Sequence, residues 1–166
     1  GVTRDRHYGV CRTGERPFVV VDTGGLSGVE EAMDVLTAKQ VRLAIEEAQV
    51  LVFVVDARDG LLPQDRTILD ELRRSGKPII AAVNKTDGLD EETALAEFAV
   101  FGIAATLPLS AAHRRGTGEL VDAMLPLLPD EPDEAEEQVE DGSIRVAIVG
   151  RPNAGKSTLI NRLLGE

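Results

Sequence analysis

Three stretches of this chain are apolar at nearly every position, and each ends at, or is directly followed by, a polar or small residue. Such runs are typical of parallel strands covered by helices on both faces, because neither row of side chains meets water. They predict buried strands over 50–56 (VLVFVVD), 78–84 (PIIAAVN) and 144–149 (IRVAIV). Two weaker patterns predict an antiparallel hairpin from 8–13 and 17–22, and an edge strand over 103–110 that contains a proline.

The segments between these strands carry apolar residues at helical spacing, as at Val41, Ala44, Ile45 and Ala48. Strands that alternate with helices in this way indicate an α/β fold with a doubly wound, mostly parallel sheet. Helices are predicted over 30–49, from Pro63 to beyond Leu72, over 91–101, over 119–125 and after the loop that follows residue 149.

Composition favours an aliphatic core, since aromatic residues make up only 3% of the 166 residues. No apolar run approaches the roughly 18 residues that a membrane span requires, so no membrane partner is expected. Cys11 is the only cysteine, which excludes an internal disulfide and favours a reducing, cytoplasmic setting.

The net charge of −11 is unevenly spread along the chain. Residues 130–141 (DEPDEAEEQVED) hold 8 acidic residues and no basic one, so the rest of the chain carries only −3. A nucleic-acid groove needs clustered Lys and Arg, and none is expected here. The acidic stretch predicts a solvated linker over 129–143, between a domain at 1–128 and a short segment at 144–166.

The last predicted strand leads into GRPNAGKST, which fits the G-x-x-x-x-G-K-[ST] pattern of the phosphate-binding loop, or P-loop. In such a loop backbone N–H groups wrap phosphates, the lysine adds charge and the serine hydroxyl can hold Mg²⁺. The loop indicates a nucleoside triphosphate but does not say which base. The residues expected to contact it here are Asn153, Ala154, Gly155, Lys156, Ser157 and Thr158.

The sequence NKTD, residues 84–87, directly follows a predicted strand and indicates guanine. The Asp87 carboxylate can accept hydrogen bonds from the ring N–H and the exocyclic amine of guanine, whereas adenine offers no such pair of donors. Lys85 can cover the base with its aliphatic stem, and Asn84 can bridge base and loop. Taken alone, NKTD is equally consistent with a surface turn; the P-loop in the same chain favours the base site.

Other segments indicate contacts to Mg²⁺ and the γ-phosphate. In DTGG, Asp22 can position Mg²⁺ and the N–H of Gly25 can donate to a γ-phosphate. Thr3 could supply a second hydroxyl to Mg²⁺, although a solvated threonine explains it as well. Ser110, Ala111 and Ala112 follow the edge strand and could donate backbone N–H groups to the guanine oxygen. His113 is interpreted as a solvated loop residue.

Together, GRPNAGKS, GVTRDR, DTGG, NKTD and SAAH resemble the translation-factor-like P-loop GTPases of the Era/EngA type. The resemblance covers essentially the whole chain and points to the tandem members of that family, which repeat the GTPase domain and end in a KH-like domain. It implies a Ras-like GTPase fold, hydrolysis of GTP to GDP and phosphate with Mg²⁺, and a switch function in large ribosomal subunit assembly. It also implies catalytic roles for Thr3, Gly25, Asn153 and Lys156, and Mg²⁺ contacts by Ser157, Thr3 and Asp22.

The resemblance further associates Asn153 with a K⁺ ion that supplies charge in the transition state. Leu26 stands where Ras-like enzymes place a glutamine that orients the attacking water, and leucine cannot do this. By the same resemblance, the chain runs from the switch I region of a first GTPase domain to the P-loop of a second. We then expect a P-loop before Gly1, and ribosome contact through the full-length protein.

Three hypotheses follow from the late position of the P-loop. The C-terminal strand and P-loop could fill the position of a missing first strand, as in a circular permutant, or could be exchanged with a second copy in a swapped dimer. The 15 residues of the linker permit the first, because they reach about 50 Å when extended. The chain could instead be a non-catalytic fragment or interaction module. A P-loop ATPase or kinase is the third hypothesis, and NKTD disfavours it.

Overall fold

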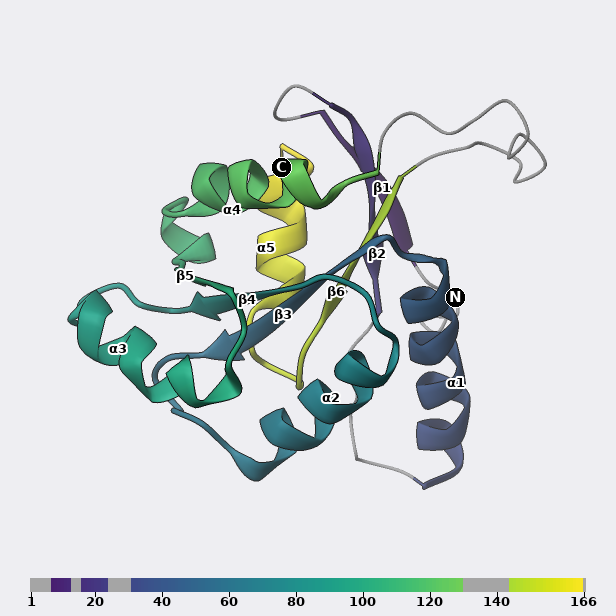
Figure 1. The fold of residues 1–166 in the computed structure, drawn as a ribbon, viewed down its shortest axis with the longest axis horizontal. Helices are drawn as coiled ribbons and strands as arrows, with labels where there is room; N and C mark the ends of the chain where they lie inside the picture. Colours follow the sequence, from purple (N-terminus) through teal and green to yellow (C-terminus); the bar gives the residue numbers. More distant parts are fainter. Residues whose placement is uncertain (1–6, 13–15, 24–30, 130–143, 166) are drawn as a thin grey trace.

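A six-stranded sheet forms the centre of the computed structural model, which describes residues 7–12, 16–23, 31–129 and 144–165 (Figure 1). The strand order is β1-β2-β6-β3-β4-β5; β1 and β2 are antiparallel, and all other neighbours are parallel. The strands are β1 His7–Cys11, β2 Phe18–Asp22, β3 Val50–Asp56, β4 Ile79–Asn84, β5 Ala105–Pro108 and β6 Arg145–Val149. The α-helices are α1 Glu31–Glu47, α2 Pro63–Arg74, α3 Glu91–Phe98, α4 Thr117–Met124 and α5 Lys156–Leu163. Three short 3₁₀ helices are η1 Ala99–Phe101, η2 Ala111–His113 and η3 Leu125–Leu127. The predicted doubly wound, mostly parallel α/β sheet is confirmed.

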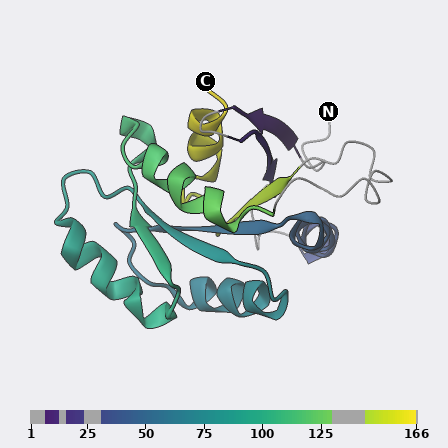
Figure 2. The same cartoon turned by 45° about the horizontal axis from the view of Figure 1, so that its top comes forward.

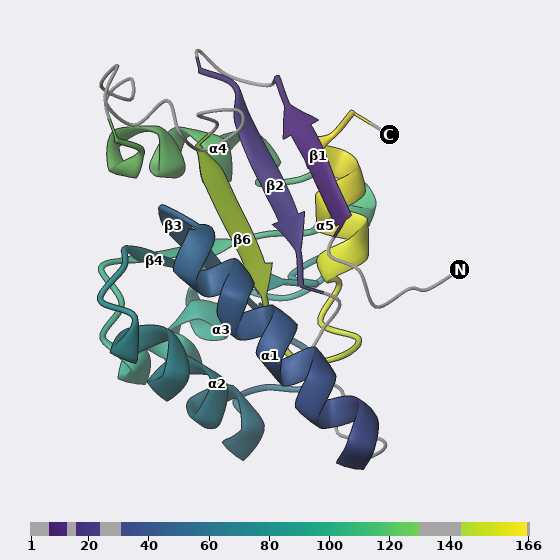
Figure 3. The same cartoon turned by 90° about the vertical axis from the view of Figure 1, so that its right-hand side faces the viewer.

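Strand β6, from the C-terminal part of the chain, lies between β2 and β3 (Figure 3). Its residues pair on both sides: Val146 stands opposite Val20 of β2 and Val50 of β3. Val146 is fully buried, as are the next two residues of the strand. A strand that is apolar at nearly every position needs both faces covered and both backbone edges paired, because buried unpaired N–H and C=O groups are costly. The gap between β2 and β3 provides this environment.

Helices cover both faces of the sheet, with α1, α2 and α3 on one face and α4 and α5 on the other (Figure 2). Successive side chains of a strand point to opposite faces, and β3 divides accordingly. Val50, Val52 and Val54 belong to the core under α4 and α5, whereas Leu51, Phe53 and Val55 belong to the core under α1–α3. Burial on both faces therefore explains the unbroken apolar sequence of this strand.

Several predicted element boundaries move by a few residues. The helix predicted over 91–101 is α3 followed by η1, and Gly102 ends it with φ 65°, the left-handed conformation that glycine adopts without strain. The helix predicted over 119–125 begins earlier, at Thr117. The strand predicted over 103–110 is the shorter β5, which lies at the edge of the sheet as expected for a strand that contains proline.

The predicted acidic linker lies outside the described residues, apart from Pro129. Beyond it, the carbonyl oxygen of Ile144 accepts a hydrogen bond from the N–H of Val19 at 2.7 Å, and β6 begins at the next residue. Among the described helices, none has the length and apolar character that a membrane span needs.

Candidate nucleotide-binding site

The P-loop connects the end of β6 to α5, and two of its glycines make close contacts with neighbouring strands. A Cβ on Gly150 would lie 2.4 Å from the carbonyl oxygen of Val54. Gly155 adopts φ 98°, and a Cβ there would lie 2.1 Å from Nδ2 of Asn84. Both contacts are with strands that precede the loop in sequence, so the loop fits closely against the earlier part of the chain.

Lys156 folds back onto the P-loop. Its Nζ donates hydrogen bonds to the carbonyl oxygens of Gly150 and Arg151, both at 2.8 Å, and only 7% of the residue is exposed. Burial lowers the pKa of Lys156 to about 8; the charge of Arg151 adds to this effect and that of Asp22 opposes it. An anion placed beside Nζ would favour the charged form of the lysine, so the site is electrostatically suited to phosphate.

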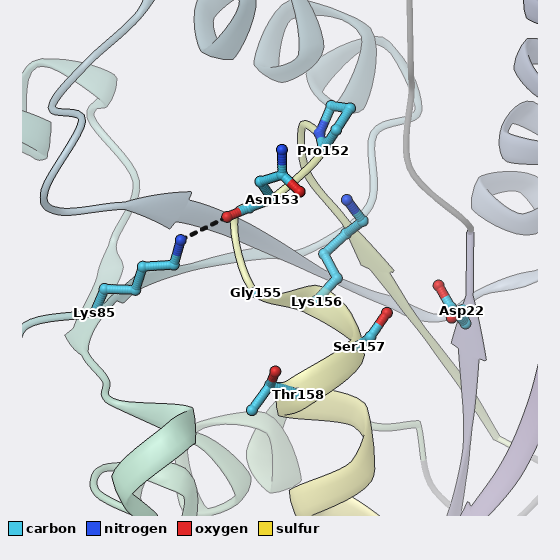
Figure 4. A pocket seen from close by; sticks show the side chains of 8 residues that line it. All are labelled: Asp22, Lys85, Pro152, Asn153, Gly155, Lys156, Ser157 and Thr158. Atoms are coloured by element: carbon cyan, nitrogen blue, oxygen red, sulfur yellow. Dashed lines mark hydrogen bonds between the residues drawn. The ribbon is translucent and has the colours of Figure 1, made fainter.

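A cavity of about 510 Å³ lies beside this lysine (Figure 4). In Figure 4, Asp22 from β2 lies on the same side as Ser157, and Lys85 from the loop after β4 lies on the opposite side, next to Asn153. The first turn of α5 contributes to the lining, where the positive end of a helix favours anions. The full lining is Asp22, Lys85, Pro152, Asn153, Gly155, Lys156, Ser157 and Thr158.

Asn84, at the end of β4, connects the P-loop to the loop after β5. Its Nδ2 donates to the carbonyl oxygen of Ala154 at 2.9 Å, and its Oδ1 accepts from the N–H of Ala111 at 3.0 Å. Asn84 is 3% exposed, so these contacts are shielded from water. In this structure, therefore, the N–H of Ala111 that was predicted to reach the guanine oxygen donates to Asn84.

Lys85, the residue after Asn84, makes a second hydrogen bond between the NKTD loop and the P-loop. Its Nζ donates to the carbonyl oxygen of Asn153 at 2.7 Å and lies 2.8 Å from Oδ2 of Asp56, at the end of β3. Burial alone would raise the pKa of Asp56, but hydrogen bonds from Lys85 and from the N–H groups of Arg58 and Asp59 outweigh it and hold the pKa below its usual value. The carboxylate is therefore ionised at neutral pH and anchors Lys85.

Asp87 contacts two residues that follow β5, Ser110 and His113. Its Oδ1 accepts a hydrogen bond from Oγ of Ser110 at 3.0 Å, and its Oδ2 lies 3.4 Å from Nε2 of His113. The Ser110 hydroxyl lowers the pKa of Asp87, and the Arg58 guanidinium lowers it further. His113 is 60% exposed, as predicted for a loop residue, but it lies against a carboxylate that its sequence context did not indicate.

The sequence reasoning missed a buried ion pair at Arg151, the residue after the first glycine of the P-loop. Its Nε bonds to Oδ1 of Asp65 in α2 at 3.1 Å, and Asp65 is fully buried. Its Nη2 lies 3.1 Å from Oδ2 of Asp59 but without hydrogen-bond geometry. A signal was available: Asp65 precedes the inward positions Ile68, Leu69 and Leu72 at i+3, i+4 and i+7, so it is a charge on an apolar stripe.

Two further polar contacts attach the strand and the helix that flank the P-loop to the rest of the fold, and neither has a clear sequence signal. Oγ1 of the buried Thr23 donates to the carbonyl oxygen of Ile148 in β6 at 2.8 Å. Nε of Arg162, in α5, donates to the carbonyl oxygen of Ala111 at 3.1 Å. The loop that carries Ala111, which was expected to face guanine, is therefore held by both Asn84 of β4 and Arg162 of α5.

The structure brings together most of the predicted site residues. Asp22, Lys85 and the P-loop residues from Asn153 to Thr158 surround or adjoin one cavity, and Asn84 ties them to the loop that carries Ser110, Ala111 and Ala112. Thr3 and Gly25 lie outside the described residues, as does Leu26. Their predicted contacts to Mg²⁺ and the γ-phosphate remain predictions.

Asp22 and Ser157 supply the kind of oxygen atoms that Mg²⁺ prefers, and both line the cavity. Mg²⁺ in nucleotide sites takes one or two protein ligands and completes its shell with phosphate oxygens and water. Within the described residues there is no cluster of three or more His, Cys, Asp and Glu side chains that could hold a metal. The donor set thus fits an ion that arrives with a nucleotide.

A P-loop at the carboxyl edge of a parallel sheet, bound through Asn84 and Lys85 to an NKTD loop, defines a P-loop GTPase domain with a Ras-like fold. The 50S ribosome-binding GTPase family matches residues 1–85 and 145–166 of the chain. These two segments make up more than half of the sequence, and the chain belongs to this family.

Curated relatives agree with the family assignment. GTPase Der of Thioalkalivibrio sulfidiphilus is 51% identical over 166 residues, and GTPase Der of Xanthomonas axonopodis pv. citri is 51% identical over 167. Each alignment covers 100% of this chain but only 36% of the relative, so the chain spans about a third of the curated relatives it matches.

Solved structures of Era are similar in fold. An Aquifex aeolicus Era variant bound to GDP·AlF4⁻ superposes with a TM-score of 0.67 and 29% identity, covering 78% of this chain and 46% of that one. Era in complex with MgGDPNP and nucleotides 1506–1542 of 16S ribosomal RNA gives a TM-score of 0.68 and 28% identity, covering 80% of this chain and 47% of that one. These likenesses confirm the predicted GTPase fold class.

Proposed function

We propose that this chain binds guanine nucleotides and hydrolyses GTP to GDP and phosphate with Mg²⁺, using the P-loop at residues 150–157. One observation carries the proposal: Asn84 and Lys85 donate hydrogen bonds to the P-loop carbonyls of Ala154 and Asn153, at 2.9 and 2.7 Å. Residues suited to reading guanine and residues suited to holding phosphate thus belong to one connected site. The Era structures with GDP·AlF4⁻ and MgGDPNP support the same chemistry.

In the proposed site each group has a distinct role. Lys156 and the backbone N–H groups from Asn153 to Thr158 hold the phosphates, and Ser157 and Asp22 hold Mg²⁺. Asp87 reads the base. Thr3 would complete the Mg²⁺ shell and Gly25 would contact the γ-phosphate.

We also propose that residues 1–128 and 144–166 act as one circularly permuted domain. The support is that β6 pairs with both β2 and β3, and that Arg151 forms a buried ion pair with Asp65. The remaining chain, 129–143, would then act as a connecting segment.

As part of a longer protein, the chain would act in the cytoplasm as a switch in large ribosomal subunit assembly. The family description, 50S ribosome-binding GTPase, supports this role. Contact with the ribosome would be made through the full-length protein.

Titration of GDP and ADP against the purified chain, with its mass in solution measured in parallel, tests the proposal. We expect a monomer that binds GDP with Mg²⁺ far more tightly than ADP. A dimer that binds GDP would indicate that the P-loop segment is exchanged between two copies. Equal binding of GDP and ADP would overturn the guanine assignment, and absence of binding would support a non-catalytic fragment.

Hydrolysis rates in K⁺ and in Na⁺ test a more specific proposal, that Asn153 helps to bind K⁺ beside the phosphates. Its side chain lines the cavity. We expect faster GTP hydrolysis in K⁺ and loss of the difference in Asn153→Ala. Equal rates in the two salts would overturn the K⁺ proposal without affecting nucleotide binding.

A further inference from the structure

Arg58, in the loop between β3 and α2, lies outside the P-loop and NKTD and is not among the residues that line the cavity. Its main-chain N–H donates to Oδ1 of Asp56 at 2.8 Å, which fixes the start of the loop. Its guanidinium reaches the NKTD loop, where Nη2 donates to the main-chain carbonyl oxygen of Asp87 and to Oδ2 of the same residue, the latter at 3.1 Å. One side chain therefore holds both the backbone and the carboxylate of Asp87.

We propose that Arg58 is a specificity-determining positioning residue, which orients the Asp87 carboxylate toward the two N–H donors of guanine. The inference rests on the proposed function and deepens it, since it assigns part of base selection to a residue outside NKTD.

The hydrogen bonds of Asp87 explain how this works. Oγ of Ser110 donates to Oδ1, and Nη2 of Arg58 donates to Oδ2. A carboxylate with a donor fixed on each oxygen cannot rotate without breaking one of the bonds. Each oxygen still has lone-pair capacity for a second donor, so both can accept from a base at the same time.

Asp56 connects Arg58 to the other side of the base site. Its Oδ1 accepts from the Arg58 N–H, and its Oδ2 pairs with Lys85 at 2.8 Å. Arg58 and Lys85 are thus aligned by one buried carboxylate at the end of β3. Substitution of the Arg58 side chain leaves its backbone bond to Asp56 in place, so the loop keeps its anchor.

Exposure to solvent limits how much the contact between Arg58 and Asp87 can change the affinity for GDP. The side chain of Arg58 is 49% exposed and that of Asp87 is 32% exposed. An exposed ion pair changes an affinity by about fivefold at most. His113 also lies near Oδ2, at 3.4 Å, and can retain part of the orientation when Arg58 is replaced.

Calorimetric titration of GDP and IDP, with Mg²⁺, into the wild-type chain, Arg58→Met, Arg58→Lys and Arg42→Met tests the proposal. Inosine lacks the exocyclic amine of guanine and engages Asp87 through one donor instead of two. Arg42 is the matched control because it too is an exposed arginine in an ion pair, with Glu71 at 2.8 Å, between α1 and α2. Thermal unfolding of each variant verifies that it is folded.

We expect Arg58→Met to weaken GDP binding by about fivefold, the limit for an exposed ion pair, and to weaken IDP binding less, so that the preference for GDP falls. Arg58→Lys should recover part of the preference, because lysine keeps a donor but loses the planar fork. Arg42→Met should change neither affinity.

Equal losses for GDP and IDP, or no loss at all, would overturn the positioning role while leaving the proposed function intact. A wild-type chain that fails to bind GDP would overturn the proposed function and this inference with it. If Arg58→Met fails to fold, the comparison of Arg58→Lys with wild type decides.

Discussion

At the scale of single residues, two separate features of the structure exclude a side chain at Gly155. Its φ of 98° is strained for other residues, and a Cβ would lie 2.1 Å from Nδ2 of Asn84. Gly76 is a matched control, because its φ is 71° and a Cβ there would have no atom within 4 Å. The left-handed backbone alone costs alanine roughly 1–2 kcal/mol, so the two variants share that cost.

We expect Gly155→Ala to lower the urea midpoint more than Gly76→Ala and, because Asn84 must move away from the P-loop, to weaken GDP binding as well. Gly76→Ala should leave GDP binding unchanged. Denaturation curves and GDP titrations measure the two effects; variants that behave alike would show that the contact with Asn84 is unimportant.

Lys156 gives a pH-dependent prediction at the same scale. Burial, the largest cause, lowers its pKa to about 8. Phosphate binds the charged form, so above pH 8 GDP binding must take up a proton. We expect the dissociation constant of GDP to rise between pH 7 and pH 9, by up to about tenfold per pH unit above 8.

The control for this prediction is Lys156→Arg, whose guanidinium remains charged over the whole range. Its GDP affinity should be lower at pH 7 but nearly independent of pH. Calorimetry in a series of buffers measures both proteins, and a flat profile for the wild-type chain would contradict a depressed pKa at this lysine.

At the scale of elements, the Arg151–Asp65 pair joins the P-loop to α2. Loss of one partner of a buried pair costs about 3–5 kcal/mol, because the other charge stays buried and unpaired. We therefore expect Arg151→Met to lower the free energy of unfolding by about that amount. Replacing both partners, in Arg151→Met with Asp65→Leu, should cost much less than the single change.

Arg42→Met, which breaks the exposed pair with Glu71, is the reference and should cost about 1 kcal/mol or less. Urea denaturation of the wild-type chain, Arg151→Met, Asp65→Leu, the double variant and Arg42→Met measures these energies. A double variant as unstable as the sum of its single variants would show that the two charges act independently.

At the scale of the whole molecule, β6 fills the centre of the sheet and α5 covers part of one face. Their removal should therefore affect the entire fold. A chain truncated after residue 143 would leave the facing edges of β2 and β3 without their hydrogen-bond partner and expose the core side chains that β6 covers. We expect it to lose cooperative thermal unfolding and GDP binding. A synthetic peptide of residues 144–166 should restore both, and a truncated chain that still unfolds cooperatively would contradict the role of β6.

Most elements could be predicted because each depends on local sequence. The continuous apolar runs of β3, β4 and β6 and the helical spacing at Val41, Ala44 and Ile45 depend only on burial and on the geometry of the backbone. Helix ends were less certain: α4 begins at Thr117, before the predicted start, because the Gly116 turn preceding it is set by a close fit to Pro108 and Leu109. That contact is made with the end of β5, and the spacing of apolar residues within the helix does not reveal it.

The residues of the site also fall into those that local sequence could predict and those that it could not. The P-loop and NKTD were evident from sequence because the chemistry of phosphate and guanine demands particular side chains in a fixed local order. The contacts of Arg58 and Arg162 were not, since each reaches a residue at least 29 positions away. The partner of Arg151 had a signal only on its own side, as the charge of Asp65 on an apolar helix stripe. A single arginine on a loop or helix surface has no periodicity that would distinguish such a contact from exposure to solvent.

The sequence by itself determined the elements, the P-loop and the base-recognition motif, because backbone periodicity and local chemistry are written in neighbouring residues. It left open whether the P-loop completes the sheet of the same chain, since a strand's sequence specifies burial but not its partners. The tertiary structure decided which strands it pairs with: β6 lies between β2 and β3, and the P-loop is held by Asn84, Lys85 and Asp65. The physical reason is that a buried apolar strand is stable only where both of its edges find hydrogen-bond partners, and that gap exists only once the rest of the sheet has formed.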